Sequence, residues 1–180
     1  MTTAVVDLGI GNMGSVANML AKLGATVDLT SDPARVGNAT RIVLPGVGNF
    51  DTATRRLMER DLVGVLNDSA AGSTPILGIC LGMQLLAESS EEGCSAGLGW
   101  IPGSVRRLPT EGPSGKVTVP HMGWSHLRVL REHRIVADTN AESRFYFVHS
   151  YVFEPTDPGD VVAVAGHQGI EFAAVVARRT

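Results

Sequence analysis

The chain has 180 residues, of which 44% are hydrophobic, so it can bury the core of one domain, and we treat residues 1–180 as a single domain. Its net charge of −3 and scattered basic residues favour neither nucleic acid nor an anionic membrane as a partner. With no secretory signal, no bilayer-length apolar run and only two cysteines, the sequence predicts a cytoplasmic protein without a disulfide framework.

The first half of the chain alternates strand patterns with helix patterns. Four short apolar runs are typical of strands: residues 4–8, 25–29, 41–44 and 76–79. Apolar residues at helical spacing predict a helix that ends at Gly24 and another over residues 50–67. The second helix is expected to turn these side chains inward: Leu57, Met58, Leu62, Val65 and Leu66. This alternation favours an α/β fold with a doubly wound, mostly parallel sheet and helices on both faces.

The second half of the chain is rich in strand patterns. They fall at residues 100–108, 144–151, 161–165 and 172–177. Polar and turn-forming residues separate them, as at 89–97 and 110–116, which predicts loops. We therefore expect an antiparallel extension of the parallel sheet rather than a second domain.

Two sequence features suggest different sites at the strand ends, and the first is a glycine-rich turn. Gly9, Gly11 and Gly14 form a G-x-G-x-x-G pattern between a strand and a helix, and Asp28 lies near the ribose-binding position of dinucleotide folds. Asp7, however, would repel a pyrophosphate, and no substrate domain follows. A nucleotide-binding α/β module is therefore kept as the less favoured alternative.

The second feature is a nucleophile elbow around Cys80. Gly78 and Gly82 flank this cysteine at two residues' distance, between an apolar strand expected to be buried and a helical pattern over residues 81–87. Such a tight strand-to-helix turn exposes the nucleophile and places it at a helix N-terminus, which favours a thiolate. The backbone N–H of Leu81 would point at a developing oxyanion. A lone cysteine is more often a small buried residue, but the paired glycines favour a nucleophile.

Residues 78–84, with the sequence Gly-Ile-Cys-Leu-Gly-Met-Gln, resemble the nucleophile motif of class I, triad-type glutamine amidotransferases. Further segments resemble, in order, motifs of one subfamily: residues 7–12, 45–48, 97–103, 119–124 and 145–151. This subfamily contains the glutaminase subunits of imidazole glycerol phosphate synthases, which act in histidine biosynthesis. The resemblance covers essentially the whole chain.

The resemblance implies that Cys80 attacks the side-chain carboxamide of glutamine and releases ammonia, without a metal or a cofactor. It implies an oxyanion hole formed by Val47, Gly48 and Leu81. It implies a glutamine-binding site formed by Gly46, Gln84, His149, Ser150 and Tyr151. The ammonia would pass to a (β/α)8-barrel cyclase subunit, the partner in a heterodimer, which makes imidazole glycerol phosphate and an aminoimidazole carboxamide ribotide. The glycine and polar residues around Trp124 predict a partly exposed aromatic of the kind found at interfaces.

One part of the family pattern is not found in this sequence, namely the late His-Pro-Glu segment that supplies the histidine base and its glutamate. None of the five histidines has that context: His121, His126, His133, His149 and His167. We expect a truncated glutaminase that hydrolyses glutamine poorly, with a non-catalytic, partner-binding homologue as the alternative. His149 or His167 as a substitute base has no motif in its favour.

Overall fold

A parallel sheet organises the first half of the chain in the computed structural model, which describes residues 1–113 and 115–178. Its strand order is β2-β1-β3-β4, and all three pairings are parallel. The strands are β1 (Thr2–Val6), β2 (Thr26–Thr30), β3 (Arg41–Gly46) and β4 (Ile76–Cys80). Because the strands are parallel, the loops after β1, β3 and β4 meet at one edge of the sheet.

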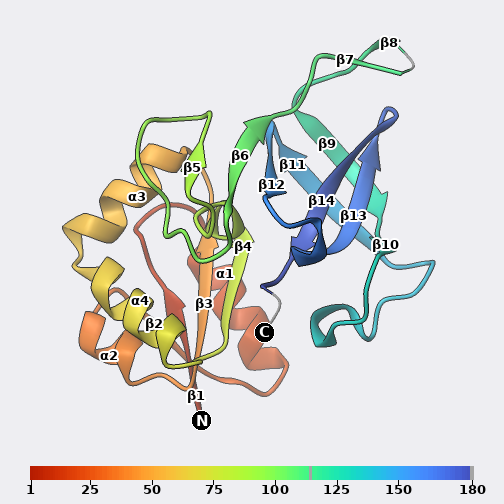
Figure 1. Cartoon of the computed structure of the whole chain (residues 1–180). Helices are drawn as coiled ribbons and strands as arrows, with labels where there is room; N and C mark the ends of the chain where they lie inside the picture. Colours follow the sequence, from red (N-terminus) through yellow and green to blue (C-terminus); the bar gives the residue numbers. More distant parts are fainter. Residues whose placement is uncertain (114, 179–180) are drawn as a thin grey trace.

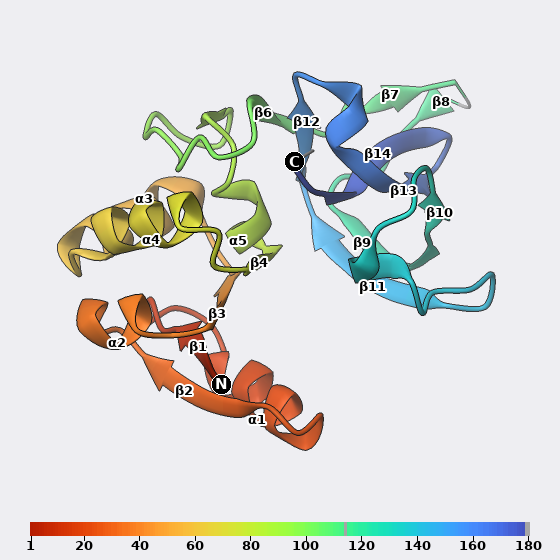
Figure 2. The same cartoon turned by 60° about the horizontal axis from the view of Figure 1, so that its bottom comes forward.

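Helices cover both faces of this sheet, as the doubly wound prediction requires. They are α1 (Met13–Lys22), α2 (Pro33–Gly37), α3 (Phe50–Glu59), α4 (Leu62–Ala71) and the short α5 (Leu81–Gln84). Figure 2 shows α1 on one side of the sheet and α2, α3 and α4 on the other. Side chains of Asn12, Asp32 and Asn49 accept hydrogen bonds from backbone N–H groups in the first turns of α1, α2 and α3, as helix N-caps do.

The second half forms a six-stranded sheet beside the parallel one (Figure 1). Its order is β10-β13-β14-β12-β6-β5, and only the β5–β6 pairing is parallel. The strands are β5 (Ser89–Ser90), β6 (Gly103–Arg107), β10 (Arg128–Val129), β12 (Tyr151–Pro155), β13 (Val161–His167) and β14 (Ile170–Val176). The second half is mostly antiparallel, as expected, and it forms a sheet of its own beside the parallel one.

Two separate two-stranded sheets and two short 3₁₀ helices complete the second half. The pairs join β9 (His121–His126) with β11 (Arg144–His149), and β7 (Glu111–Gly112) with β8 (Gly115–Lys116). The 3₁₀ helices are η1 (Arg134–Val136) and η2 (Pro158–Asp160). Across the described residues, no helix has both the length and the apolar character needed to cross a membrane.

One hydrophobic core joins the two halves. Leu44 and Phe50 from the first half are fully buried in it, together with Leu85 from the chain after α5. Val105 of β6 and Phe153 of β12 belong to the same cluster. The second sheet is therefore packed against the region that follows β4, and this packing fixes the position of that region.

The expected helix over residues 50–67 is two helices, and the break explains which side chains are buried. Asp61 adopts a left-handed conformation, with φ of 54°, between α3 and α4. Leu57 and Leu62 are five residues apart, a spacing that would separate them around one continuous helix. The break rotates the second helix so that both are buried, whereas Met58 is exposed, contrary to the prediction.

Strand β4 was expected to be buried, and this expectation is wrong. It is the last strand in its sheet order, and Leu77 and Ile79 are each more than one-third exposed. An apolar run predicts the strand but not its place in the sheet, so the sequence could not distinguish a central strand from an edge strand. The expected helix over residues 81–87 is also shorter, because regular helix ends at Gln84.

Candidate active site

The elbow at Cys80 is present and its backbone is strained. Cys80 ends β4 and is followed at once by α5, with φ of 56° and ψ of −118°. A residue with a side chain seldom adopts such a conformation, which costs on the order of 1–3 kcal/mol and is concentrated at functional sites. The turn leaves Cys80 exposed at the carboxyl edge of the parallel sheet.

The two glycines around Cys80 are required by the close approach of three backbone segments. A Cβ atom at Gly78 would lie 2.6 Å from the carbonyl oxygen of Gly82. A Cβ atom at Gly82 would overlap the carbonyl oxygen of Leu44 in β3. The spacing seen in the sequence is therefore explained by packing of the elbow against itself and against the neighbouring strand.

The prediction that the elbow favours a thiolate is wrong for this structure. Burial raises the pKa of the Cys80 thiol, and the hydrogen bond from the Leu81 N–H only partly offsets that increase. The residue is exposed overall, but protein surrounds the sulfur closely enough for desolvation to dominate. The helix that follows has only four residues, so its dipole is small. Among the described residues, no histidine contributes to the pKa of Cys80.

The predicted oxyanion segment lies directly beside Cys80. Gly46 is the register partner of Cys80 in the β3–β4 pairing, and a Cβ atom on Gly46 would lie 3.0 Å from the backbone nitrogen of Gly82. Val47 follows with about half of its surface exposed, and Gly48 has φ of 100°. Because a residue other than glycine is strained at that φ, the sequence of this turn follows from its shape.

The structure also brings part of the predicted glutamine-binding segment to the elbow. The Nε2 atom of Gln84, in α5, donates to the carbonyl oxygen of Tyr151 at 3.2 Å. The Nδ1 atom of His149 lies 3.0 Å from the same oxygen. Ser150 lies between β11 and β12, and its carbonyl oxygen accepts from the Leu108 N–H at 2.8 Å. The segment from 149 to 151 is thus tied directly to the helix that begins after Cys80.

Beside this segment lies a cluster of aromatic rings that the sequence did not predict. Its members are His121, Phe147, His149, His167 and Phe172. His121 and His149 face each other across the β9–β11 pair, with Nδ1 of His121 3.1 Å from Nε2 of His149. Burial, with smaller effects from His167 and His149, lowers the pKa of His121 to about 4, and burial also lowers the pKa of His149.

The opposite face of the β9–β11 pair is apolar and exposed. Met122 pairs with Val148 and Trp124 pairs with Tyr146, and all four side chains are more than half exposed. The rings of Trp124 and Tyr146 meet edge to face, with centroids 5.5 Å apart. The predicted exposure of Trp124 is confirmed. We call these four residues the apolar face.

The glycine-rich turn after β1 is occupied by contacts of its own. Asp7 accepts a hydrogen bond from the Gly9 N–H at 2.8 Å, and a Cβ atom on Gly11 would overlap the Val47 side chain. Asp28 accepts from Nε of Arg35 at 2.9 Å. The carboxylate that a ribose would need is thus ion-paired, and the turn packs on the oxyanion segment, so these contacts do not favour the nucleotide alternative.

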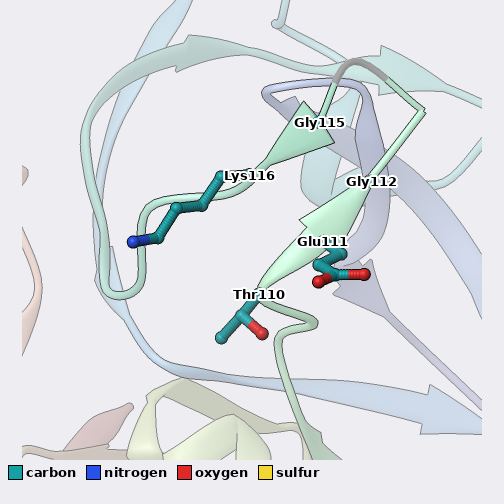
Figure 3. A pocket seen from close by; sticks show the side chains of 5 residues that line it. All are labelled: Thr110, Glu111, Gly112, Gly115 and Lys116. Carbon is teal, nitrogen blue, oxygen red and sulfur yellow. The ribbon is translucent and has the colours of Figure 1, made fainter.

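A hollow of about 330 Å³ lies beside the β7–β8 hairpin, at residues other than those of the elbow. Figure 3 shows Thr110, Glu111, Gly112, Gly115 and Lys116 around it. Glu111 and Lys116 are register partners, and their side chains point to different sides of the hairpin in this view. None of the predicted site residues is among those that line it.

Comparisons with known proteins agree with the geometry of the elbow. The family described as "Glutamine amidotransferase class-I" matches residues 4–180. A protein from Methanococcus maripaludis named "Imidazole glycerol phosphate synthase subunit HisH 2" is 39% identical over 176 residues, which is 97% of this chain and 85% of that protein. The protein of the same name from Pseudomonas aeruginosa is 41% identical over 175 residues, with the same two coverages. A crystal structure titled as a glutamine amidotransferase superposes with a TM-score of 0.64 at 16% identity, covering 94% of this chain and 86% of the other, which supports the fold.

Proposed function

The chain belongs to the class I glutamine amidotransferase family, and we propose that it is the glutaminase subunit of an imidazole glycerol phosphate synthase. In this role it supplies ammonia for histidine biosynthesis. The observation that carries the proposal is the elbow, where a cysteine with φ of 56° stands between two glycines that close packing requires. We treat residues 1–180 as one amidotransferase domain, which the core shared by the two halves supports.

Cys80 is the nucleophile of the proposed reaction. Its thiolate adds to the carboxamide carbon of glutamine, and the carboxamide oxygen becomes an oxyanion. The Leu81 N–H, which bonds the Cys80 sulfur in this structure, and backbone N–H groups of Val47 and Gly48 would stabilise that oxygen. The nitrogen takes up the proton that the Cys80 thiol lost, the C–N bond breaks, and ammonia leaves a γ-glutamyl thioester. Water then cleaves the thioester, which yields glutamate and restores the thiol.

The amino-acid end of glutamine is held by the segment that Gln84 ties to the elbow. We assign Gly46, Gln84, His149, Ser150 and Tyr151 to this binding site. The support is the hydrogen bond from Gln84 to the Tyr151 carbonyl, because it fixes the distance between the nucleophile's helix and that segment. In this arrangement the Gln84 amide positions backbone as well as facing substrate.

The partner is a (β/α)8-barrel cyclase subunit that receives the ammonia and forms a heterodimer with this chain. We propose that it binds at the apolar face. A surface where Met122, Trp124, Tyr146 and Val148 are all more than half exposed is the kind of aromatic-rich patch that forms the core of an interface. A cytoplasmic location belongs to this proposal, because a nucleophilic thiol needs reducing surroundings.

The described residues provide no evident general base for Cys80. The pKa of Cys80 is raised, and no histidine among the described residues contributes to it. We therefore expect slow glutamine turnover by the 180-residue chain. The same observation keeps a second candidate function, a homologue that binds the cyclase without catalysis.

The test is glutamate release by the chain together with its cyclase, compared with trapping of Cys80 by a glutamine-like electrophile. Slow release with efficient trapping supports a glutaminase that lacks its base. Cys80→Ala should abolish trapping, and Cys94→Ala, which removes the other exposed thiol, should leave it unchanged. Binding of the cyclase with neither trapping nor glutamine binding would support the non-catalytic homologue instead.

A further inference from the structure

The carbonyl oxygen of Tyr151 shows which ring nitrogens carry protons in a chain of side chains next to the glutamine-binding segment. A carbonyl oxygen can only accept a hydrogen bond, so Nδ1 of His149, 3.0 Å away, must carry a proton. In the neutral ring the other nitrogen, Nε2, is then an acceptor. The pKa of His149 is lowered by burial, which keeps the ring neutral near pH 7.5.

The acceptor on His149 is met by His121. Nδ1 of His121 lies 3.1 Å from Nε2 of His149, so it must be the donor of this pair. His121 Nε2 is left as an acceptor, and the hydroxyl of Ser125 lies 3.3 Å from it. That hydroxyl is also 3.4 Å from the Gly166 carbonyl oxygen, and its single proton serves one of the two acceptors.

His121 is held in place by packing as well as by hydrogen bonds. Only 3% of its surface is exposed. Its ring stacks with that of His167 at 4.2 Å between centroids and with that of Phe147 at 5.3 Å. His167 is itself bound through Nε2 to the Thr118 carbonyl oxygen at 2.8 Å. A side chain this confined presents its Nδ1–H in one direction.

We propose that His121 is a positioning residue for the glutamine site, because its Nδ1–H holds His149 in the tautomer that grips the Tyr151 carbonyl. Gln84, in the helix that follows the nucleophile, donates a hydrogen bond to the same oxygen. The Tyr151 carbonyl is thus the point where the elbow and the substrate segment are joined. The inference rests on the proposed function, which assigns residues 149–151 to glutamine binding.

Loss of the His121 donor has a defined consequence. Nε2 of the half-buried His149 would lose its hydrogen-bond partner. The Tyr151 carbonyl oxygen alone would then favour Nδ1–H, against the usual preference of a neutral histidine ring for Nε2–H. In the Nε2–H tautomer, Nδ1 turns a lone pair toward that oxygen. A shift toward this tautomer loosens the grip on the segment from 149 to 151.

The test compares His121→Phe, which keeps an aromatic ring and removes the donor, with His121→Asn. The amide nitrogen of asparagine occupies nearly the place of Nδ1, so this second variant retains the donor. Both are made in a Cys80→Ala background, which prevents turnover. The tautomer of His149 is read from histidine ¹⁵N chemical shifts without ligand at pH 7.5, and glutamine affinity is measured by calorimetry.

We expect His149 to be an Nδ1–H tautomer in the parent and in His121→Asn, and to shift toward Nε2–H in His121→Phe. Glutamine affinity should fall about tenfold in His121→Phe and recover to within about threefold of the parent in His121→Asn. An unchanged tautomer and affinity in His121→Phe would overturn the inference. A parent that does not bind glutamine would refute the proposed site and the role of His121 in it, while the ¹⁵N shifts would still decide whether His121 sets the tautomer of His149.

Discussion

The elbow and the aromatic cluster lie on either side of the Tyr151 carbonyl, and they are built in opposite ways. The elbow is a feature of backbone, formed within a few residues, with a strained Cys80 and glycines where no side chain fits. The cluster is a feature of side chains from β9, β11, β13 and β14, which together extend over residues 121–176. Both ring nitrogens of His121 and of His149 have hydrogen-bond partners, whereas Cys80 has a raised pKa and no histidine among the described residues that lowers it.

This difference shows which part of the structure orients the nucleophile and which part holds the substrate-binding segment. Backbone sterics orient the nucleophile, within the turn itself and against the neighbouring strand β3. Holding a substrate segment needs donors and acceptors supplied by strands that meet only in the folded state. The predictions below test whether the two regions are as separable as this comparison implies.

The largest expected effect is on the elbow. Gly82→Ala places a Cβ atom against the Leu44 carbonyl oxygen, and neither backbone segment can move without disturbing the β3–β4 pair. We expect a loss of about 3 kcal/mol or more in the free energy of unfolding, measured by urea denaturation.

The matched control is Gly64→Ala. Gly64 lies inside α4, and a Cβ atom there meets nothing within 4 Å. We expect a gain of about 0.5–1 kcal/mol from helix propensity and a less flexible unfolded chain. Equal effects of the two substitutions would show that the elbow is not constrained by packing.

The cluster should make stability depend on pH. The pKa of His121 is lowered in the folded state from 6.5 to about 4, so the unfolded chain binds the proton more readily between these values. The stability of the fold is therefore complete above pH 6.5 and decreases as the pH falls toward 4, by about 3 kcal/mol from this group.

This pH effect is measured by urea unfolding at several pH values, and His121→Asn supplies the comparison. Asparagine does not titrate, so the variant should lose much less stability than the parent between pH 6.5 and 4. Parallel pH profiles for the two proteins would contradict the burial of a neutral His121, since carboxylates titrate in both.

The sequence predicted the local region well and the distributed region poorly. The spacing of Gly78, Cys80 and Gly82 was enough to identify the elbow. Each glycine is required because backbone a few residues away, or on the next strand, leaves no room for a Cβ atom. The sequence analysis considered His121 and His149 separately and predicted no contact between them. Their contact depends on the register of β9 against β11, and single-residue patterns do not determine which residues of two distant strands face each other.

Two errors in the sequence predictions have the same origin. Leu77 and Ile79 predict a strand, but their exposure depends on which strand ends the sheet. The expected thiolate at Cys80 followed from the position at a helix start, whereas the pKa depends on how the protein surrounds the sulfur. In both cases the sequence pattern predicted the secondary structure correctly, but burial and the pKa depend on residues that are close only in the folded protein.

The apolar face should contribute to binding of the cyclase rather than to the stability of the fold. Trp124→Ala should weaken binding of the cyclase by about 2 kcal/mol, or roughly 30-fold, because large aromatics dominate interface energies. Met122→Ala should have a smaller effect, and Met58→Ala on α3, with similar exposure, should have none. Calorimetric titration with the cyclase distinguishes these cases. Weakened binding in Met58→Ala as well would point to a different interface.

The smallest expected effect concerns the Cys80 thiol itself. In a Cys94→Ala background Cys80 is the only cysteine, and its reaction with iodoacetamide reports the thiolate fraction. Because burial raises its pKa, the thiol should be less ionised at pH 8 than a free cysteine, and the rate should rise to its plateau at higher pH. The midpoint of that rise is the quantity to compare with a small-molecule thiol, since restricted access lowers the rate at every pH without moving the midpoint. A midpoint below that of the free thiol would mean that the Leu81 N–H and the helix start outweigh burial. The elbow would then lower the pKa of Cys80 without a neighbouring histidine.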